Sequence, residues 1–148
     1  MKVPFLIGRV IFGGFFIYNG IHHLAERKPM SQFARAKNVP MPDAAVTLSG
    51  LMLLFGGASI LLGIKPKWGV AATVGFLSGV SPVMHDFWKA EDPNQRMMDM
   101  IQFSKNMALL GGALALAGTE EPWPVSVPMK NRGPLDKLRT AARDAIAA

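Results

Sequence analysis

Residues 3–24 read VPFLIGRVIFGGFFIYNGIHHL, and Arg9 is the only Lys, Arg, Asp or Glu in this stretch. Because an α-helix rises about 1.5 Å per residue, about 20 apolar residues cross the hydrocarbon core of a bilayer, which is about 30 Å thick. No small-residue cleavage site precedes His22 and His23, so we expect a retained helix rather than a signal peptide. The chain is therefore predicted to begin with a transmembrane helix.

Three more apolar stretches follow, at residues 44–64, 68–84 and 100–118. Half of the chain is apolar, and it contains 15 glycines, which membrane helices tolerate because glycine lets two backbones approach closely. We therefore predict an all-α integral membrane protein. Residues 1–118 are expected to form one four-transmembrane-helix bundle in contact with the lipid bilayer.

The rest of the chain, residues 119–148, differs in composition from the predicted spans. Residues 120–128 contain three prolines and Trp123, so we expect an extended connector along the surface. The last part places apolar residues on one helical face among basic residues, which predicts a short basic amphipathic tail helix. We expect this tail to bind anionic lipid or a partner protein. Its apolar residues are Leu135, Leu138, Ala142 and Ile146, and the basic residues nearby are Lys130, Arg132, Lys137, Arg139 and Arg143.

The composition also excludes several classes of chemistry. The chain has no cysteine, which excludes disulfides, thiolate metal sites and iron–sulfur clusters. A redox role would therefore use a bound cofactor or substrate. The net charge of +6 comes mainly from loops and the tail. In a membrane protein such basic residues contact lipid head groups, so we expect no nucleic-acid partner.

Polar residues gather on one face of the predicted bundle. Because successive spans run in opposite directions, the end of the first span and the 84–100 connection share one face of the membrane. The residues on this face are His22, His23, His85, Asp86 and Asp99, with Lys105 and Asn106 about one to two turns deeper.

Two charged residues inside the spans need a partner or a route to water. Arg9 lies about two turns inside the first helix, where a charge costs about 3 kcal/mol, so it either snorkels to the interface or donates to an anion or a quinone carbonyl. Lys105 and Asp86 approach from the same face. We expect them to form an ion pair, as a purely structural contact or as part of a proton relay.

The three histidines are candidates for ligand binding. Imidazole donates, accepts and titrates near neutral pH, so it can hydrogen-bond a quinone carbonyl and exchange its protons. Adjacent helical residues point about 100° apart, so His85 would act with either His22 or His23. The alternatives are histidines that only lie at the head-group level, a metal site with Asp86, and axial ligation of haem or chlorophyll. We assign no metal site.

Several short motifs occur in order along the predicted spans. They are Gly8-Arg9 with Tyr18-Asn19-Gly20-Ile21-His22-His23-Leu24, then Leu48-Ser49-Gly50, Gly56-Gly57 and Leu61-Leu62-Gly63, then His85-x-Phe87-Trp88, and last Phe103-x-Lys105-Asn106 with Gly111-Gly112. In these motifs, residues 3–118 resemble the DoxX family of small bacterial four-helix membrane proteins. His23 stands where many members have lysine, and the basic tail looks like an addition.

This resemblance implies a redox setting in the bacterial plasma (inner) membrane. Members are similar to the small subunit of a membrane thiosulfate:quinone oxidoreductase and to a protein needed for methylamine dehydrogenase maturation. We therefore expect a subunit of a membrane oxidoreductase complex that binds quinone, rather than a stand-alone enzyme. The competing expectation is a non-enzymatic accessory or scaffold subunit of a larger membrane complex. The candidate cofactor-binding residues are His22, His23, His85, Lys105, Asn106, Arg9 and Asp86, with Asn19 and Ser49 as neutral polar contacts.

The orientation follows from the number of spans and the position of the cations. Four spans place both termini on one side, and the basic tail favours the cytoplasmic side. We therefore expect a multi-pass protein with both termini in the cytoplasm and the polar face outside.

Overall fold

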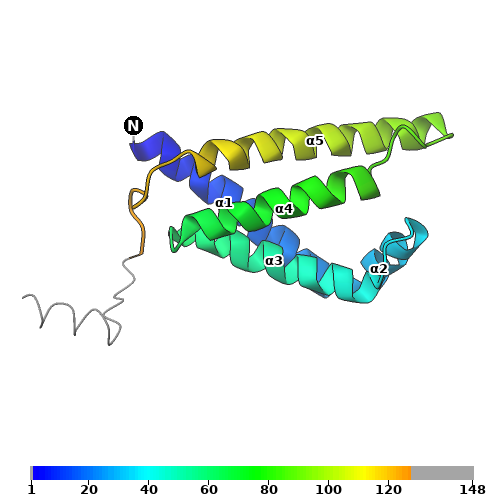
Figure 1. Cartoon of the computed structure of the whole chain (residues 1–148), viewed down its shortest axis with the longest axis horizontal. Coiled ribbons are helices and arrows are strands. Elements are labelled where there is room, and N and C mark those ends of the chain that lie inside the picture. Colours follow the sequence, from blue (N-terminus) through cyan, green and yellow to red (C-terminus); the bar gives the residue numbers. More distant parts are fainter. Residues whose placement is uncertain (1, 128–148) are drawn as a thin grey trace, which may run out of the picture.

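The chain folds into helices joined by short connections (Figure 1). The computed structural model describes residues 2–127, and within this range there is no strand, which confirms the all-helical prediction. Four of the helices are long and one is short. Their bounds are Lys2–Ala25 for α1, Arg27–Ala36 for α2, Pro42–Leu62 for α3, Pro66–Met84 for α4 and Pro93–Ala117 for α5.

Glycine sets how closely the central helices pack. A Cβ atom added to Gly57 on α3 would lie 2.7 Å from the carbonyl oxygen of Gly13 on α1. On α4, a Cβ added to Gly69 would lie 2.5 Å from the carbonyl oxygen of Gly56 on α3. Both distances are too short for a carbon–oxygen contact, so only glycine permits these approaches. α3 therefore packs directly on α1 and on α4, and α4 packs in turn on α5.

The apolar core lies along this series of helices in two clusters. The first joins α1, α3 and α4, and the second packs against Phe5 and Phe12 of α1 and includes a tryptophan that follows α5. The buried members are Phe16, Leu53 and Leu77 in the first cluster and Ile60, Val70, Ala113 and Trp123 in the second.

Two of the helices are long and apolar enough to cross a membrane, over Val3–Ala25 and Pro42–Leu62. Only 22% and 33% of their most apolar windows are buried in the chain, and Ile11 and Phe55 are 67% and 68% exposed. A core helix of a soluble protein would bury such side chains, so these outward faces are suited to lipid. α4 and α5 have 19 and 25 residues but do not meet the same criterion of apolar composition. The expected count of four spans therefore remains a prediction.

The first connection differs from the sequence-based expectation, because it contains the short helix α2. Met30, Phe33 and Ala34 have the i, i+3, i+4 spacing of one helical face, while the charged residues of the segment lie elsewhere. α2 packs on α3, and Ala34 is buried. The expected amphipathic tail helix, by contrast, lies outside the described residues.

The segment 119–127 packs on the bundle more closely than an extended surface connector would. Trp123 is 2% exposed, and its ring meets that of Phe5 edge to face at 5.4 Å. Val127 N–H also donates to the carbonyl oxygen of Leu62 at 2.9 Å. The prolines exclude a helix here, but they did not indicate that the tryptophan between them would be buried.

Arg9 holds this segment in place. Its two terminal nitrogens donate to the carbonyl oxygens of Pro124 and Val125, each at 2.8 Å, and the residue is 4% exposed. These bonds stabilise the buried charge at both terminal nitrogens, while Nε has no hydrogen-bond partner among the described residues, so Arg9 does not need to snorkel to water. Both terminal nitrogens already donate to the backbone, and the alternative expectation that Arg9 donates to an anion or quinone carbonyl stays a prediction.

Candidate functional site

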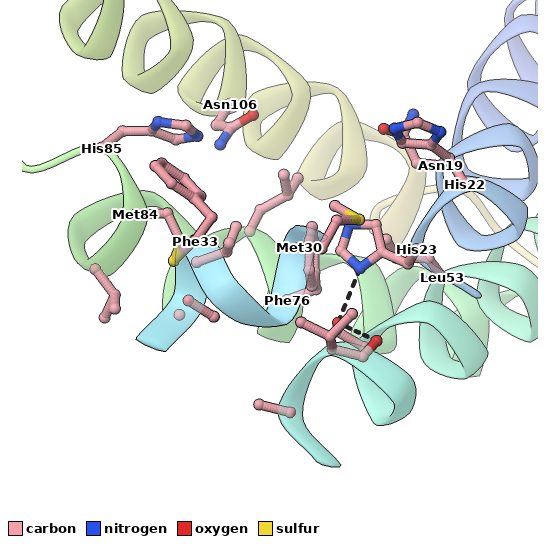
Figure 2. A pocket seen from close by; sticks show the side chains of 18 of the residues that line it. Asn19, His22, His23, Met30, Phe33, Leu53, Phe76, Met84, His85 and Asn106 are labelled. Atoms are coloured by element: carbon pink, nitrogen blue, oxygen red, sulfur yellow. Dashed lines mark hydrogen bonds between the residues drawn. The ribbon is translucent and has the colours of Figure 1, made fainter. Parts of the chain in front are cut away.

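A pocket of about 700 Å³ lies among the five helices, at the α2 end of the bundle (Figure 2). Its polar residues come mainly from α1, α5 and the end of α4, with Ser49 from α3 and Glu26 just before α2, and α2 closes one side. Most of its wall is apolar. The apolar residues that meet there include Phe16, Met30, Phe33, Leu53, Phe76, Leu77 and Leu109.

The structure brings five of the seven candidate residues to this pocket. They are His22, His23, His85, Lys105 and Asn106, and the neutral contacts Asn19 and Ser49 line it as well. Arg9 and Asp86 do not line it. Arg9 lies about three helical turns from Asn19 along α1, where it binds the 119–127 segment. Asp86 follows His85 in the chain, but its side chain pairs with Lys37 outside the pocket.

His23 is held by a neighbouring helix. Its Nδ1 lies 3.0 Å from the hydroxyl of Ser49, and that hydroxyl is also 3.0 Å from the carbonyl oxygen of Val46. When the hydroxyl proton of Ser49 points to that carbonyl, the serine oxygen accepts from His23 Nδ1–H, which is the tautomer assigned here to His23. Phe76 of α4 packs its ring edge against the imidazole, with ring centres 5.9 Å apart. The second ring nitrogen of His23, Nε2, has no hydrogen-bond partner among the described residues.

His85 is held in the same way by a carboxylate. Its Nδ1 lies 3.4 Å from Asp99 Oδ1, and Asp99 is 3% exposed. An ionised carboxylate only accepts, so His85 donates through Nδ1–H and leaves Nε2 as the free nitrogen. Figure 2 shows the ring of His85 pointing toward the amide of Asn106 on α5. Asn106 is 8% exposed and makes no side-chain hydrogen bond to another described residue.

A group of charged side chains lies next to His85, and the ion pairs within it differ from the pair expected from the sequence. Lys37 Nζ is 2.5 Å from Asp86 Oδ1 and 3.7 Å from Asp99 Oδ2, and Lys89 Nζ is 3.6 Å from Asp86 Oδ2. The hydrogen bond to Asp86 raises the pKa of Lys37, and the same bond lowers the pKa of Asp86. These residues therefore stay charged over a wider pH range than isolated side chains.

The expected ion pair between Lys105 and Asp86 was therefore wrong. Lys105 Nζ donates to Gln102 Oε1 on its own helix and is exposed. The physical reason is that α2 carries the chain close to the loop after α4, so Lys37 reaches Asp86 first. The sequence gives no direct signal for that contact, which joins residues 49 positions apart.

Two other polar residues of α1, Asn19 and His22, lie nearer to the surface than His23 does. Asn19 Nδ2 donates to the carbonyl oxygen of Phe15 at 2.7 Å, which leaves its side-chain oxygen free to accept. His22 is exposed, and its ring stacks on that of Tyr18 with centres 6.2 Å apart. Of the two adjacent histidines, His23 is the one fixed in the wall of the pocket.

The contributions of α2 and of Asp99 to the site were not predicted from the sequence. The spacing of Met30, Phe33 and Ala34 was the available signal for α2. Asp99 was placed on the correct face, but its contact with His85 depends on the loop conformation. Among residues 2–127, no group of three or more His, Cys, Asp or Glu side chains converges in a way that could hold a metal ion.

Comparison with known families gives a match that covers more than half of the chain. The model of the family described as DoxX matches residues 5–86. The chain belongs to the DoxX family. Membership agrees with the apolar, outward-facing α1 and α3, and supports a membrane protein. No curated protein and no solved structure matches the chain. The matched DoxX region includes His22, His23 and His85 and ends before α5, which carries Lys105 and Asn106.

Proposed function

We propose that this DoxX protein is a four-span component of a redox system in the bacterial plasma membrane, and that it binds quinone in the pocket beside His23 and His85. The observation that carries the proposal is the convergence of these two oriented histidines on one large apolar pocket. A quinone and its reduced form suit such a combination, because the ring and tail are apolar and the oxygens accept hydrogen bonds in the oxidised form and donate them in the reduced form.

The size and lining of the pocket support a ligand of this class. Small-molecule sites are typically about 300 to 1,000 Å³, mostly apolar, with a few polar groups that fix orientation. The volume of about 700 Å³ lies within this range. Phe16 and Phe76 offer aromatic surface to a ring, and Asn19 and Asn106 add hydrogen-bonding amides.

The opening of the pocket supports entry of a lipophilic ligand from the membrane. His22 on α1 and Lys105 on α5 both line the pocket and are both exposed. Figure 1 shows α1 and α5 diverging toward the end that carries α2. A ligand dissolved in lipid would therefore enter between these two helices.

Binding of a short-tailed benzoquinone to the purified full chain in lipid nanodiscs tests this proposal. Phe76→Ala removes a ring from the pocket wall, and Phe55→Ala is the matched control because Phe55 is 68% exposed on the outer face of α3. Loss of one ring contact should weaken binding about tenfold in Phe76→Ala and leave Phe55→Ala unchanged. Equal affinities in the three proteins, or no binding by the wild type, would contradict quinone binding in this pocket.

A second candidate function is that of an accessory subunit in a larger membrane complex. Two glycines favour it, because a Cβ added to Gly75 on α4 or to Gly111 on α5 would meet nothing within 4 Å. These glycines do not serve packing among the described residues, and small residues on an outer helix face favour contact with another membrane helix. A native mass of the gently solubilised protein equal to one chain would argue against this function. A larger, defined mass that Gly75→Leu reduces would support it.

A further inference from the structure

The two oriented histidines present the same chemical group to the pocket. Asp99 accepts from His85 Nδ1–H, and Ser49 accepts from His23 Nδ1–H when its own proton points to the carbonyl oxygen of Val46. In a neutral imidazole one nitrogen carries the proton and the other accepts. Each Nε2 is therefore a hydrogen-bond acceptor. The free side-chain oxygen of Asn19 adds a third acceptor to the same pocket.

Acceptors of this kind distinguish the two redox forms of a quinone. The oxidised form carries carbonyl oxygens, which only accept, whereas the reduced form carries hydroxyl groups, which donate. A hydroxyl placed against Nε2 forms a hydrogen bond, whereas a carbonyl oxygen in that place leaves two acceptors facing each other. Sites with buried groups that need a hydroxyl partner discriminate strongly against analogues that lack it.

We infer that the pocket binds the reduced, dihydroxy form of its quinone more tightly than the oxidised form. This inference rests on the proposed quinone binding. Asn106 can donate or accept through its amide and so suits either form, and Lys105 lies at the exposed edge of the pocket, where one of its three N–H groups donates to Gln102. The acceptors, by contrast, are held in one orientation by Ser49 and Asp99.

Asp99 and Ser49 act in this account as positioning residues, because they set which nitrogen carries the proton. In Asp99→Asn, the amide nitrogen can donate to His85 Nδ1, so the proton moves to Nε2 and the acceptor becomes a donor. In Ser49→Ala, His23 loses the partner that selects its tautomer. Both variants should reduce the preference for the reduced form. Asp43→Asn and Ser104→Ala are matched controls, because both residues are exposed and neither lines the pocket.

The experiment measures equilibrium binding of a decyl-benzoquinone and of its hydroquinone to the full chain in nanodiscs, without oxygen and at pH 8, where imidazoles are in general neutral. We expect the hydroquinone to bind about tenfold tighter to the wild type and to both controls. The ratio should fall to about twofold or less in Asp99→Asn and Ser49→Ala. Equal binding of the two forms, or tighter binding of the quinone, would overturn the inference while leaving the proposed function in place. If neither form binds, both are overturned.

A measurement without ligand tests the same inference independently. Nitrogen-15 NMR of labelled histidine reports which ring nitrogen carries the proton. We expect His23 and His85 to be protonated on Nδ1 in the wild type at pH 8, and His85 to change in Asp99→Asn. Protonation of either residue on Nε2 in the wild type would overturn the inference even if both ligands bound.

Discussion

Lys37 Nζ lies 2.5 Å from Asp86 Oδ1, and this pair ties the segment after α2 to the loop after α4. The side chains are 21% and 15% exposed, so water screens the pair only in part. The same lysine lies 3.7 Å from Asp99, which holds His85. Lys37 and Asp86 outside the pocket therefore help to fix Asp99, which in turn holds His85 in the pocket wall.

Separate and joint replacement of Lys37 and Asp86 should show strong coupling. Either Lys37→Met or Asp86→Asn alone leaves a partly buried charge without its partner, so each should cost about 1 to 3 kcal/mol of unfolding free energy. The double variant should cost less than the sum. Unfolding in detergent provides the measurement, and the same cycle with Lys105 in place of Lys37 is the control. Additive losses for Lys37 and Asp86 would contradict the pairing.

The stability of the bundle should depend on pH through the same pair. The lowered pKa of Asp86 means that its contribution is complete above its ordinary value of 3.8 and is lost as the pH falls through its folded-state pKa. The raised pKa of Lys37 means that its contribution is complete below 10.5 and is lost as the pH rises through its folded-state pKa. The coupling energy from the mutant cycle should therefore be constant between about pH 5 and 9 and fall at both extremes. A coupling that changes near pH 7 would contradict this assignment.

Removal of Arg9 should release the segment that follows α5. Arg9→Met leaves the carbonyl oxygens of Pro124 and Val125 without their donors, which should cost about 1 to 3 kcal/mol. The fluorescence of Trp123 should then shift to longer wavelength as its ring becomes hydrated. Trp68 and Trp88 would be replaced by Phe in the protein used, so that the fluorescence comes from Trp123 alone. Quinone binding should persist in this variant, because the pocket lies at the other end of the bundle. An unchanged spectrum would contradict the role assigned to Arg9.

Two glycines on neighbouring helices should respond in opposite ways to added side-chain volume. Gly57→Ala places a Cβ 2.7 Å from the backbone oxygen of Gly13 and should force α1 away from α3, at a cost of about 1 to 3 kcal/mol. Gly75→Ala meets nothing within 4 Å and should leave the isolated chain at least as stable. Thermal unfolding of the two variants makes the comparison. Equal destabilisation would show that α4 packs differently.

The sequence predicts those parts of the fold and site that depend on local periodicity. The apolar lengths of α1 and α3 and the positions of His22 and His23 at the end of α1 could be read directly from spacing. Contacts made by loops could not be predicted, because the position of a charged residue in a connection follows no helical periodicity that would identify its partner. Lys37 rather than Lys105 therefore reached Asp86. Arg9 and Pro124 are likewise separated by 115 positions, so their hydrogen bond depends on the complete packing of the chain.

Photolabelling with an azido-benzoquinone tests the central claim, quinone binding in the pocket, most directly. The full chain in nanodiscs would be illuminated with the probe and digested, and the labelled residues would be located by mass spectrometry. We predict labels on pocket residues such as Met30, Phe76 and Met84, and loss of these labels when excess unlabelled quinone is present. Labels confined to outward residues such as Phe55, or labels that excess quinone does not reduce, would contradict the claim.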